Sequence, residues 1–444
     1  MWKIVSLILL PLLLYCEDLE VQLATRTQMK PVYLSRLHVP SSEYDWRYFD
    51  ELRSLLEFDL NINGFTTVLP IRDDAEDRLK WPDVRSEFDR LYWKKERVPY
   101  VLAVQVFLDR FQLLVFDVEN ETAKKYADIP LTGKIEDDRQ PIHRLADAVQ
   151  KDLFGVEGIS SLKILYSHRH RSADGWISEI WVCDSDGANP TQVTFEKGYC
   201  LSPGFLPPSA SKDKEFYYVC FNQGQSKIYR SSLTKQQGEP MVSLKGNQAL
   251  PAITKKGTQM AFITDAAGRP DLFIQNLDST GKMQGKARQL YSAPRATQAS
   301  PTFSPDGKQI AFVSDKDGPP RIYLLDVIGP KETKRAAPRL LTKKNRENTS
   351  PAWSPDGTKL AYSAKVDGIR QIWIYDFATQ EEVQLTSSPE NKENASWAPD
   401  NLHLVYNTES EDISELYLIH LNQGEPILIS RGPDQKRFAC WETR

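Results

Sequence analysis

The chain has 444 residues, more than one hydrophobic core usually serves, so we expect at least two domains. Lys and Arg total 56 against 60 for Asp and Glu, and this near balance excludes the broad basic surface of a nucleic-acid-binding protein. The 22 Gly and 28 Pro residues are concentrated in the last two-thirds of the chain, which is typical of a fold with many turns.

Residues 1–16 have the pattern of a secretory signal peptide. Lys3 precedes an apolar run from Ile4 to Leu14, which is too short to span a bilayer. We expect cleavage near Cys16 and an exported mature chain without a membrane-spanning segment. The alternative is lipid attachment at Cys16, although a lipoprotein signal has a small residue where Tyr15 stands.

Residues 17–157 predict a small α+β domain that begins with an extended arm. The arm, residues 17 to about 30, has too few apolar groups to form a core, so we expect it to contact a partner. Apolar patterning then predicts strands at 32–39, 65–69, 100–108, 111–118 and 124–129, and helices after Ser41 or Ser42, at 86–95 and at 141–154. Strands and helices alternate early and strands cluster later, which favours a mixed sheet with helices on one side.

A repeat occupies residues 158–444. Ser300-Pro-Thr-Phe-Ser-Pro-Asp-Gly307 recurs as Ser350-Pro-Ala-Trp-Ser-Pro-Asp-Gly357, and each copy is followed by two apolar runs. Ser-Pro-Asp-Gly fits a type I turn between short strands, and a run such as 310–313 is apolar without alternation, as in a strand covered on both faces. Each copy is therefore a small antiparallel sheet that must stack on its neighbours, as the blades of a propeller do.

The number of blades follows from the strand that opens each repeat. Openers of this kind end at Phe205, Ile253, Phe303, Trp353, Trp397 and Trp441. The last opener has no second strand after it, while the first repeat lacks an opener. The sequence thus predicts an all-β six-bladed propeller that is closed by the C-terminal strand.

No pattern in the chain predicts catalysis, a metal or a cofactor. There is no G-x-S-x-G, and Ser160-Ser-Leu-Lys163 matches S-x-x-K without its accompanying motifs. His168-Arg-His-Arg171 offers two imidazoles but no nearby acidic cluster. The cysteines at 16, 183, 200, 220 and 440 form no Cys-x-x-Cys pair, which leaves both a disulfide and buried thiols open.

Six polar loops should converge on one mouth of the propeller channel, because each precedes an innermost strand. We take this mouth as the candidate partner-binding site, with the residues Tyr199, Asn247, Gln248, Leu250, Gln298, Ser300, Asn348, Ser350, Asn394 and Arg437. The alternative is that these amides and hydroxyls only satisfy the backbone of tight turns.

The repeats resemble those of the TolB family, the periplasmic component of the bacterial Tol-Pal envelope system. The helix Arg144–Gly155, followed by Lys163-Ile-Leu-Tyr166, is similar to the family's connection into the propeller. Leu206-Pro-Pro and Thr254-Lys-Lys-Gly257 replace the expected turn in two repeats and imply a diverged member.

The resemblance implies a periplasmic, monomeric, non-enzymatic scaffold that maintains outer-membrane integrity and division constriction. It implies that the channel mouth binds Pal, the peptidoglycan-associated lipoprotein, which makes the protein peripheral to the outer membrane. It also implies that the arm engages TolA through Glu20, Val21, Gln22 and Leu23. Two alternatives remain: an exported propeller-containing hydrolase, and a propeller module for another ligand.

Overall fold

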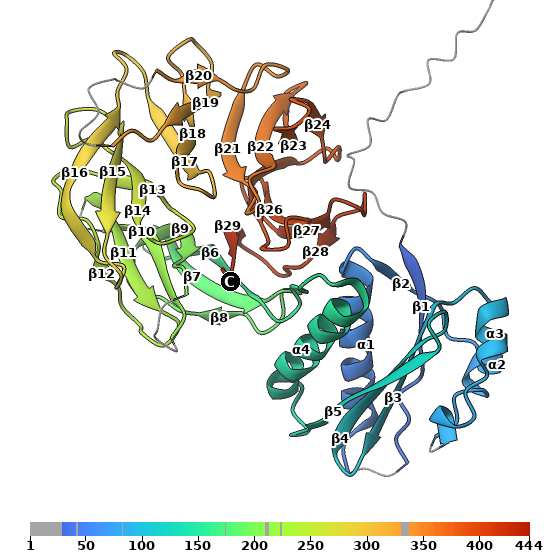
Figure 1. The fold of residues 1–444 in the computed structure, drawn as a ribbon. Helices are drawn as coiled ribbons and strands as arrows, with labels where there is room; N and C mark the ends of the chain where they lie inside the picture. The colour runs from blue at the N-terminus through green and yellow to red at the C-terminus, as the bar shows by residue number, and fades with distance from the viewer. Residues whose placement is uncertain are drawn as a thin grey trace, which may run out of the picture.

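The computed structural model describes residues 29–444, except 41–42, 82, 174, 209–212, 223 and 330–336. The expected signal peptide, Cys16 and almost all of the expected arm lie outside the described residues. The described chain has two parts, a sheet with helices and a larger ring of sheets (Figure 1). Among the helices of the described residues, none is both long and apolar enough to cross a membrane.

The first part has a mixed five-stranded sheet. Its strands are β1 (Lys30–Leu34), β2 (Thr66–Val68), β3 (Tyr100–Phe107), β4 (Arg110–Asp117) and β5 (Thr122–Pro130). Its helices are α1 (Trp46–Ile62), α2 (Asp73–Glu76), the 3-10 turn η1 (Asp83–Arg85), α3 (Arg90–Lys95) and α4 (Ile135–Phe154). The sheet order is β2-β1-β3-β4-β5, with β1 parallel to both neighbours and the last three strands antiparallel.

Helices cover both faces of this sheet, so the expectation of helices on one side was wrong. On one face α1 and α4 pack against residues such as Leu102 and Val104, and on the other α2, η1 and α3 enclose Trp93 with Val101 and Phe116. Central β3 is buried along most of its length, because each face has its own apolar cluster. Helix α3 lies within the helix predicted at 86–95, whereas α2 and η1 were not predicted.

The two long helices begin at other residues than expected. Asp45 caps α1, where Ser41 or Ser42 was expected to do so, since the Asp45 carboxylate accepts from the Arg47 N–H at 2.9 Å. Helix α4 begins at Ile135, upstream of Pro141, with three acidic residues in its first turn to complement the helix dipole. It ends as predicted at Gly155, whose φ of 71° places it in the left-handed region.

The second part consists of short antiparallel strands. They are β6 (Lys163–Ser172), β7 (Gly175–Asp184), β8 (Thr191–Gln192), β9 (Tyr199–Phe205), β10 (Glu215–Asn222), β11 (Gln225–Ser232), β12 (Glu239–Pro240), β13 (Gln248–Ile253), β14 (Gln259–Thr264), β15 (Asp271–Leu277), β16 (Met283–Tyr291), β17 (Gln298–Phe303), β18 (Gln309–Ser314), β19 (Arg321–Asp326), β20 (Arg339–Leu340), β21 (Asn348–Trp353), β22 (Lys359–Val366), β23 (Ile369–Asp376), β24 (Glu382–Gln384), β25 (Asn391–Trp397), β26 (His403–Glu409), β27 (Leu416–His420), β28 (Ile427–Leu428) and β29 (Gln435–Trp441).

Four of these sheets have four strands each, and we call them blades 3 to 6 in chain order, beginning with β13, β17, β21 and β25. The remaining strands form one eight-stranded sheet. Within it β29, β6, β7 and β8 make blade 1, and β9 to β12 make blade 2. The two are joined by one parallel pair, Ser178 with Tyr199. The C-terminal strand β29 thus pairs antiparallel with β6, the first strand of the repeat region.

The repeated turn and the apolar strand behave as the sequence predicts. In blade 4 the Ser304 carbonyl accepts from the Gly307 N–H at 2.8 Å, and Gly307 has a φ of 72°, which glycine adopts without strain. The strand that follows is buried on both faces: Ala311 and Val313 pack toward blade 5, while Ile310 and Phe312 pack toward blade 3. Successive side chains of this strand point alternately into the two clusters, which explains why its sequence is continuously apolar.

The described cysteines include both a disulfide and free thiols. Cys200 on β9 and Cys220 on β10 form a disulfide within blade 2, where the two residues lie directly opposite each other in the paired strands. Cys183 and Cys440 are free thiols on β7 and β29. Burial raises the pKa of the Cys440 thiol to about 12, so it stays protonated and unreactive.

A chain that ends at Asp434 should be much less stable than the full chain. It would lose β29, its pairing with β6, and the buried indole of Trp441, which is 4% exposed. Loss of one large buried aromatic side chain alone costs about 3–5 kcal/mol. Thermal and urea unfolding should show this, and a truncated chain that melts within about two degrees of the full chain would mean that β29 does not hold the ring together.

Candidate partner-binding mouth

Six innermost strands surround a central channel. They are β9, β13, β17, β21, β25 and β29, and each lies beside the next around the ring. The first residues of these strands form what we call the distal mouth. The turns at the other ends of the strands form the proximal mouth, which faces the N-terminal domain because the turn of blade 6 contacts helix α1.

The innermost strands share a four-residue pattern at the distal mouth. The pattern covers residues 199–202, 247–250, 297–300, 347–350, 391–394 and 435–438, and its second residue is buried: Cys200, Gln248, Gln298, Asn348, Lys392 and Lys436. The third residue is partly exposed: Leu201, Ala249, Ala299, Thr349, Glu393 and Arg437. The fourth has a left-handed backbone, with φ between 44° and 57°, and lines the channel: Ser202, Leu250, Ser300, Ser350, Asn394 and Phe438.

The left-handed residue marks a bulge in each innermost strand. The register between β17 and β18, for example, shifts between Ala299 and Thr302, on either side of Ser300. Such bulges bend a strand and redirect its side chains. A cavity of about 180 Å³ lies at this level of the channel and is lined by residues of all six strands.

Three predicted site residues are buried and cannot touch a partner directly. Gln248, Gln298 and Asn348 are 0%, 1% and 0% exposed. The Gln248 amide donates to the carbonyls of Val242 and Leu244, both at 3.1 Å, and so braces the loop before the strand. The turn-satisfying alternative therefore describes these three residues, because the period of two along a strand places them on the covered side.

The other predicted mouth residues do lie together. Leu250, Ser300, Ser350 and Asn394 line the channel, and the Ser350 hydroxyl donates to the Asn394 side-chain oxygen at 3.2 Å. Tyr199 and Arg437 are partly exposed, and Asn247 is exposed and bonded to Asp265. Glu20, Val21, Gln22 and Leu23 lie outside the described residues.

The partly exposed third position is apolar on one half of the ring and polar or charged on the other half. Blades 2 to 4 present Leu201, Ala249 and Ala299. On the opposite half, Arg370 lies 2.9 Å from Glu393, and Arg437 lies 2.6 Å from Glu409. Burial raises the pKa of Glu393, against the opposing effect of Arg370 and Arg437.

Sequence reasoning missed an aromatic cluster on the rim of this mouth, where blades 1 and 2 join. Trp176 and Phe221 are 41% and 49% exposed, and Phe221 is directly opposite Tyr199 in the sheet. The Arg169 guanidinium lies 4.0 Å from the Trp176 ring centre and 5.4 Å from that of Tyr199. Both exposed aromatics stand beside hairpin turns, which is the signal that the sequence offered.

The residues considered for catalysis or metal binding have structural roles. Asp147 accepts from the Ser160 N–H at 2.8 Å, and Lys163 forms an ion pair with Asp184. His168 and His170 have ring centres 6.0 Å apart, and His168 lies 3.4 Å from Asp434. In the part of the chain that the structure describes, one group has metal-ligand geometry, His143 with Asp184 and Asp186, but its carboxylates already pair with Arg139 and Lys163.

Comparisons with known proteins agree with this architecture. The computed structure superposes on the crystal structure of TolB from Acinetobacter baumannii with a TM-score of 0.71 and 22% identity, over 94% of this chain and 97% of that one. The chain is 42% identical over 286 residues to "Protein TolB homolog" of Protochlamydia amoebophila, which is 63% of this chain and 61% of the relative. It is 34% identical to the TolB homologue of Chlamydia caviae, over 62% of this chain and 60% of the relative.

The match to both curated relatives thus spans about three-fifths of their length. A family model described as the TolB beta propeller domain matches residues 150–443, which includes every innermost strand of the ring. This chain therefore belongs to the TolB β-propeller family.

Proposed function

We propose that this chain is a periplasmic scaffold of the Tol-Pal system, which binds the lipoprotein Pal at the distal mouth and TolA through its N-terminal arm. Through these two partners the chain would maintain outer-membrane integrity and constriction at cell division. The observation that carries it is the divided distal mouth, with an apolar half on blades 2 to 4 and a charged half opposite. Protein–protein interfaces commonly combine apolar contacts with polar and charged ones, and a surface of that kind fits a protein partner.

The size of the channel favours a protein partner over a small molecule. The cavity at the bulge ring is about 180 Å³, below the roughly 300–1,000 Å³ of small-molecule pockets. The rim adds Trp176, Tyr199 and Arg169, and Trp, Tyr and Arg are the residue types that dominate interface energies. A protein that covers the mouth and its rim can use both.

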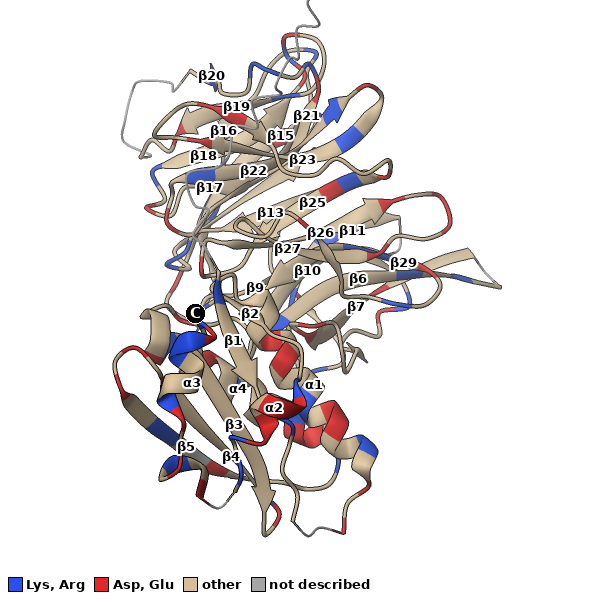
Figure 2. Cartoon of the chain, turned by 90° about the vertical axis from the view of Figure 1, so that its right-hand side faces the viewer, with Lys and Arg blue, Asp and Glu red and all other residues tan. Residues whose placement is uncertain are grey.

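The proposed scaffold has two domains after a signal peptide and no catalytic activity. We place the signal peptide at 1–16, the arm and α+β domain at 17–157, and a six-bladed ring closed by β29 at 158–444. The charges are mixed in sign over both parts (Figure 2), which fits a monomeric binding protein without a nucleic-acid partner. Neither a cofactor nor a metal is needed for this role.

A module for another ligand is the second candidate, and one observation favours it. The proximal mouth opens into a cavity of about 660 Å³, lined by Trp353, Trp397 and Trp441 together with residues 155–157 between the two domains. That volume is within the range of small-molecule pockets.

Pal binding should weaken when either the rim or the charged half of the distal mouth is altered. Trp176→Ala removes the exposed indole that stacks on Arg169, and Glu393→Lys reverses the charge beside Arg370. We expect at least one of these changes to cost more than about 2 kcal/mol, or roughly 30-fold in Kd by calorimetry.

Lys308→Ala is the matched control, because Lys308 is exposed beside the turn of blade 4 at the proximal mouth. It should leave the affinity unchanged. Loss of binding in this variant alone would place Pal on the proximal side. A folded wild-type chain that binds no Pal would favour the second candidate.

Deletion of residues 17–28 should abolish TolA binding and leave the melting temperature nearly unchanged. The described part of the chain forms its core without these residues, since the sheet begins at Lys30. Pull-down of TolA with the full and the shortened mature chain, together with thermal melts of both, checks the expectation. Equal capture of TolA by the two chains would show that the arm is not its binding site.

A further inference from the structure

Two buried histidines lie where the N-terminal domain packs on the propeller. His143 is on α4 and faces blade 1, and His403 is on β26 of blade 6, in contact with the end of α1. Their exposed fractions are 0% and 1%. Each has a carboxylate partner within its own part of the chain, and each also faces a group of the other part.

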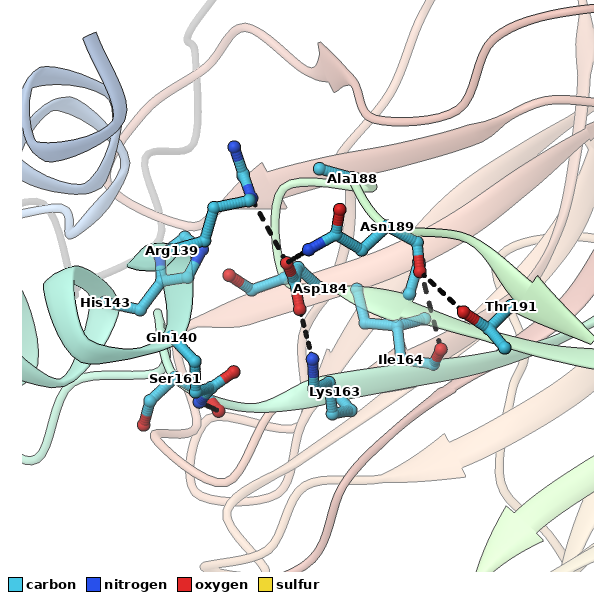
Figure 3. Close-up of polar contacts among 12 residues, drawn as sticks. Arg139, Gln140, His143, Ser161, Lys163, Ile164, Asp184, Ala188, Asn189 and Thr191 are labelled. Carbon is cyan, nitrogen blue, oxygen red and sulfur yellow. Dashed lines mark hydrogen bonds and ion pairs between the residues drawn. The ribbon is translucent and has the colours of Figure 1, made fainter. Parts of the chain in front are cut away.

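His143 belongs to a buried cluster of charges that spans the two parts (Figure 3). Arg139 of α4 pairs with Asp184 at 3.2 Å and also with Asp186, and Lys163 pairs with Asp184 from the other side. The Nδ1 atom of His143 lies 2.8 Å from the Asp59 carboxylate. Its Nε2 atom has no hydrogen-bond partner among the described residues.

The cluster holds more carboxylates than permanent cations. Three carboxylates, Asp59, Asp184 and Asp186, face Arg139 and Lys163, and Asp147 lies near Asp59. A ligand atom of His143 and one oxygen each of Asp184 and Asp186 lie within 4.8 Å of one another. A proton on the His143–Asp59 pair would therefore offset part of this excess, whereas its loss would leave additional buried negative charge.

The hydrogen bonds of His403 require an imidazolium independently. Its Nδ1 atom lies 2.5 Å from a carboxylate oxygen of Asp400, and its Nε2 atom lies 2.5 Å from the carbonyl oxygen of Ile62. When Asp400 is ionised, neither partner has a proton to donate, so each can only accept a hydrogen bond. A neutral imidazole has a single N–H and could donate to only one of them. Asp400 also accepts from the backbone N–H groups of Leu402 and His403 at 3.0 and 3.1 Å, and these two hydrogen bonds favour its ionised form.

Blade 6 departs from the repeat at this place. At the same register of the other blades stand the pairs Gln259 with Asn276, Gln309 with Asp326, and Lys359 with Asp376, whereas blade 6 has His403 with His420. His420 accepts from the Asn422 N–H through Nδ1 at 2.9 Å, and burial together with the charge of His403 lowers its pKa to about 3, so it stays neutral. The ring of His420 also fills the space that a side chain at Gly64 would need.

We propose that the joint between the two domains is a proton-dependent latch, in which His143 and His403 hold the N-terminal domain on the propeller as imidazolium ions and release it partly when they lose their protons to solvent. In the released state His403 keeps one of its two hydrogen bonds. The cluster around His143 then carries an excess negative charge.

The direction of the pH dependence follows from the groups that face His143. These are Asp59 from α1, Arg139 and Asp147 from α4, Lys163 from β6, and Asp184 and Asp186 from β7 and its turn. Burial disfavours the charged form, but Asp59, followed by Asp186 and Asp184, outweighs it and raises the pKa of His143. Burial also raises the pKa of Asp59, so the pair retains its proton.

A raised histidine pKa stabilises the joint fully below the unfolded-state pKa of about 6.5, and this stabilisation is lost as the pH rises through the folded-state pKa. The groups around His403 are Asp400 and the neutral His420. The latch is therefore closed in mild acid and loosens toward alkaline pH.

Selective isotope labelling of the six histidines of the mature chain tests the protonation states directly. At about pH 7, where an unperturbed histidine is mostly neutral, the ring-nitrogen shifts of two residues should be those of imidazolium. The signals missing in His143→Gln and in His403→Gln assign them. If His143 and His403 are both neutral at about pH 6, the latch does not exist.

The second measurement follows the joint itself in the full mature chain. Spin labels at Leu91→Cys, an 81% exposed position on α3, and at Lys308→Cys in blade 4 report the distance between the two parts. The distance distribution should broaden from about pH 6 to about pH 9. In the His143→Gln/His403→Gln variant it should be broad throughout, without a pH transition.

His170→Gln is the control, because His170 lies on β6 at the distal end of blade 1, and it should keep the wild-type transition. The residue introduced by His403→Gln stands at the same register in blades 3 and 4, and circular dichroism melts check that both variants are folded. A distribution that does not change with pH in the wild type, or the same transition in the double variant, would overturn the proposal.

Discussion

The fold depends on the fact that each blade has apolar residues on both faces and cannot be stable alone. The second strand of every blade carries at least one large buried aromatic residue, and these include Tyr166, Tyr218, Phe262, Phe312, Tyr362 and Tyr406. Each is covered by the neighbouring sheets, so every blade is a part of its neighbours' cores. The same stacking forces the six innermost strands around one axis, and this is why residues far apart in sequence meet at the distal mouth.

Strong local patterns were enough to predict most of this architecture. The Ser-Pro-Asp-Gly turn and the apolar second strands each have one local physical explanation, and the structure places them as expected. The strand that ends at Trp441 pairs with β6, and the closure of a six-bladed ring stays a prediction. Helix α3 lies within the helix predicted at 86–95 and ends at the same residue. The four-residue helix α2 was not predicted, because it buries only Ala75 and has no apolar pattern of its own.

The site was harder to predict than the fold. The loops before the innermost strands lie together at one mouth, but which residue is buried depends on a register of one position, and a shift by one exchanges buried Gln298 for partly exposed Ala299. Contacts between the two parts could not be predicted at all. The approach of His403 to the Ile62 carbonyl joins residues 341 apart in sequence, and its only trace in the sequence is a departure from the repeat.

The pairing of β29 with β6 has a consequence for the order of events during synthesis. A backbone N–H at Lys163 bonds to the side chain of Glu442, which is 279 residues later, and β6 has no partner on that side until the end of the chain arrives. A chain that is made from its N-terminus therefore exposes an open strand edge until its last strand is complete. Such distant contacts form slowly, so the last strand sets the time at which the folded protein becomes safe from aggregation and proteolysis.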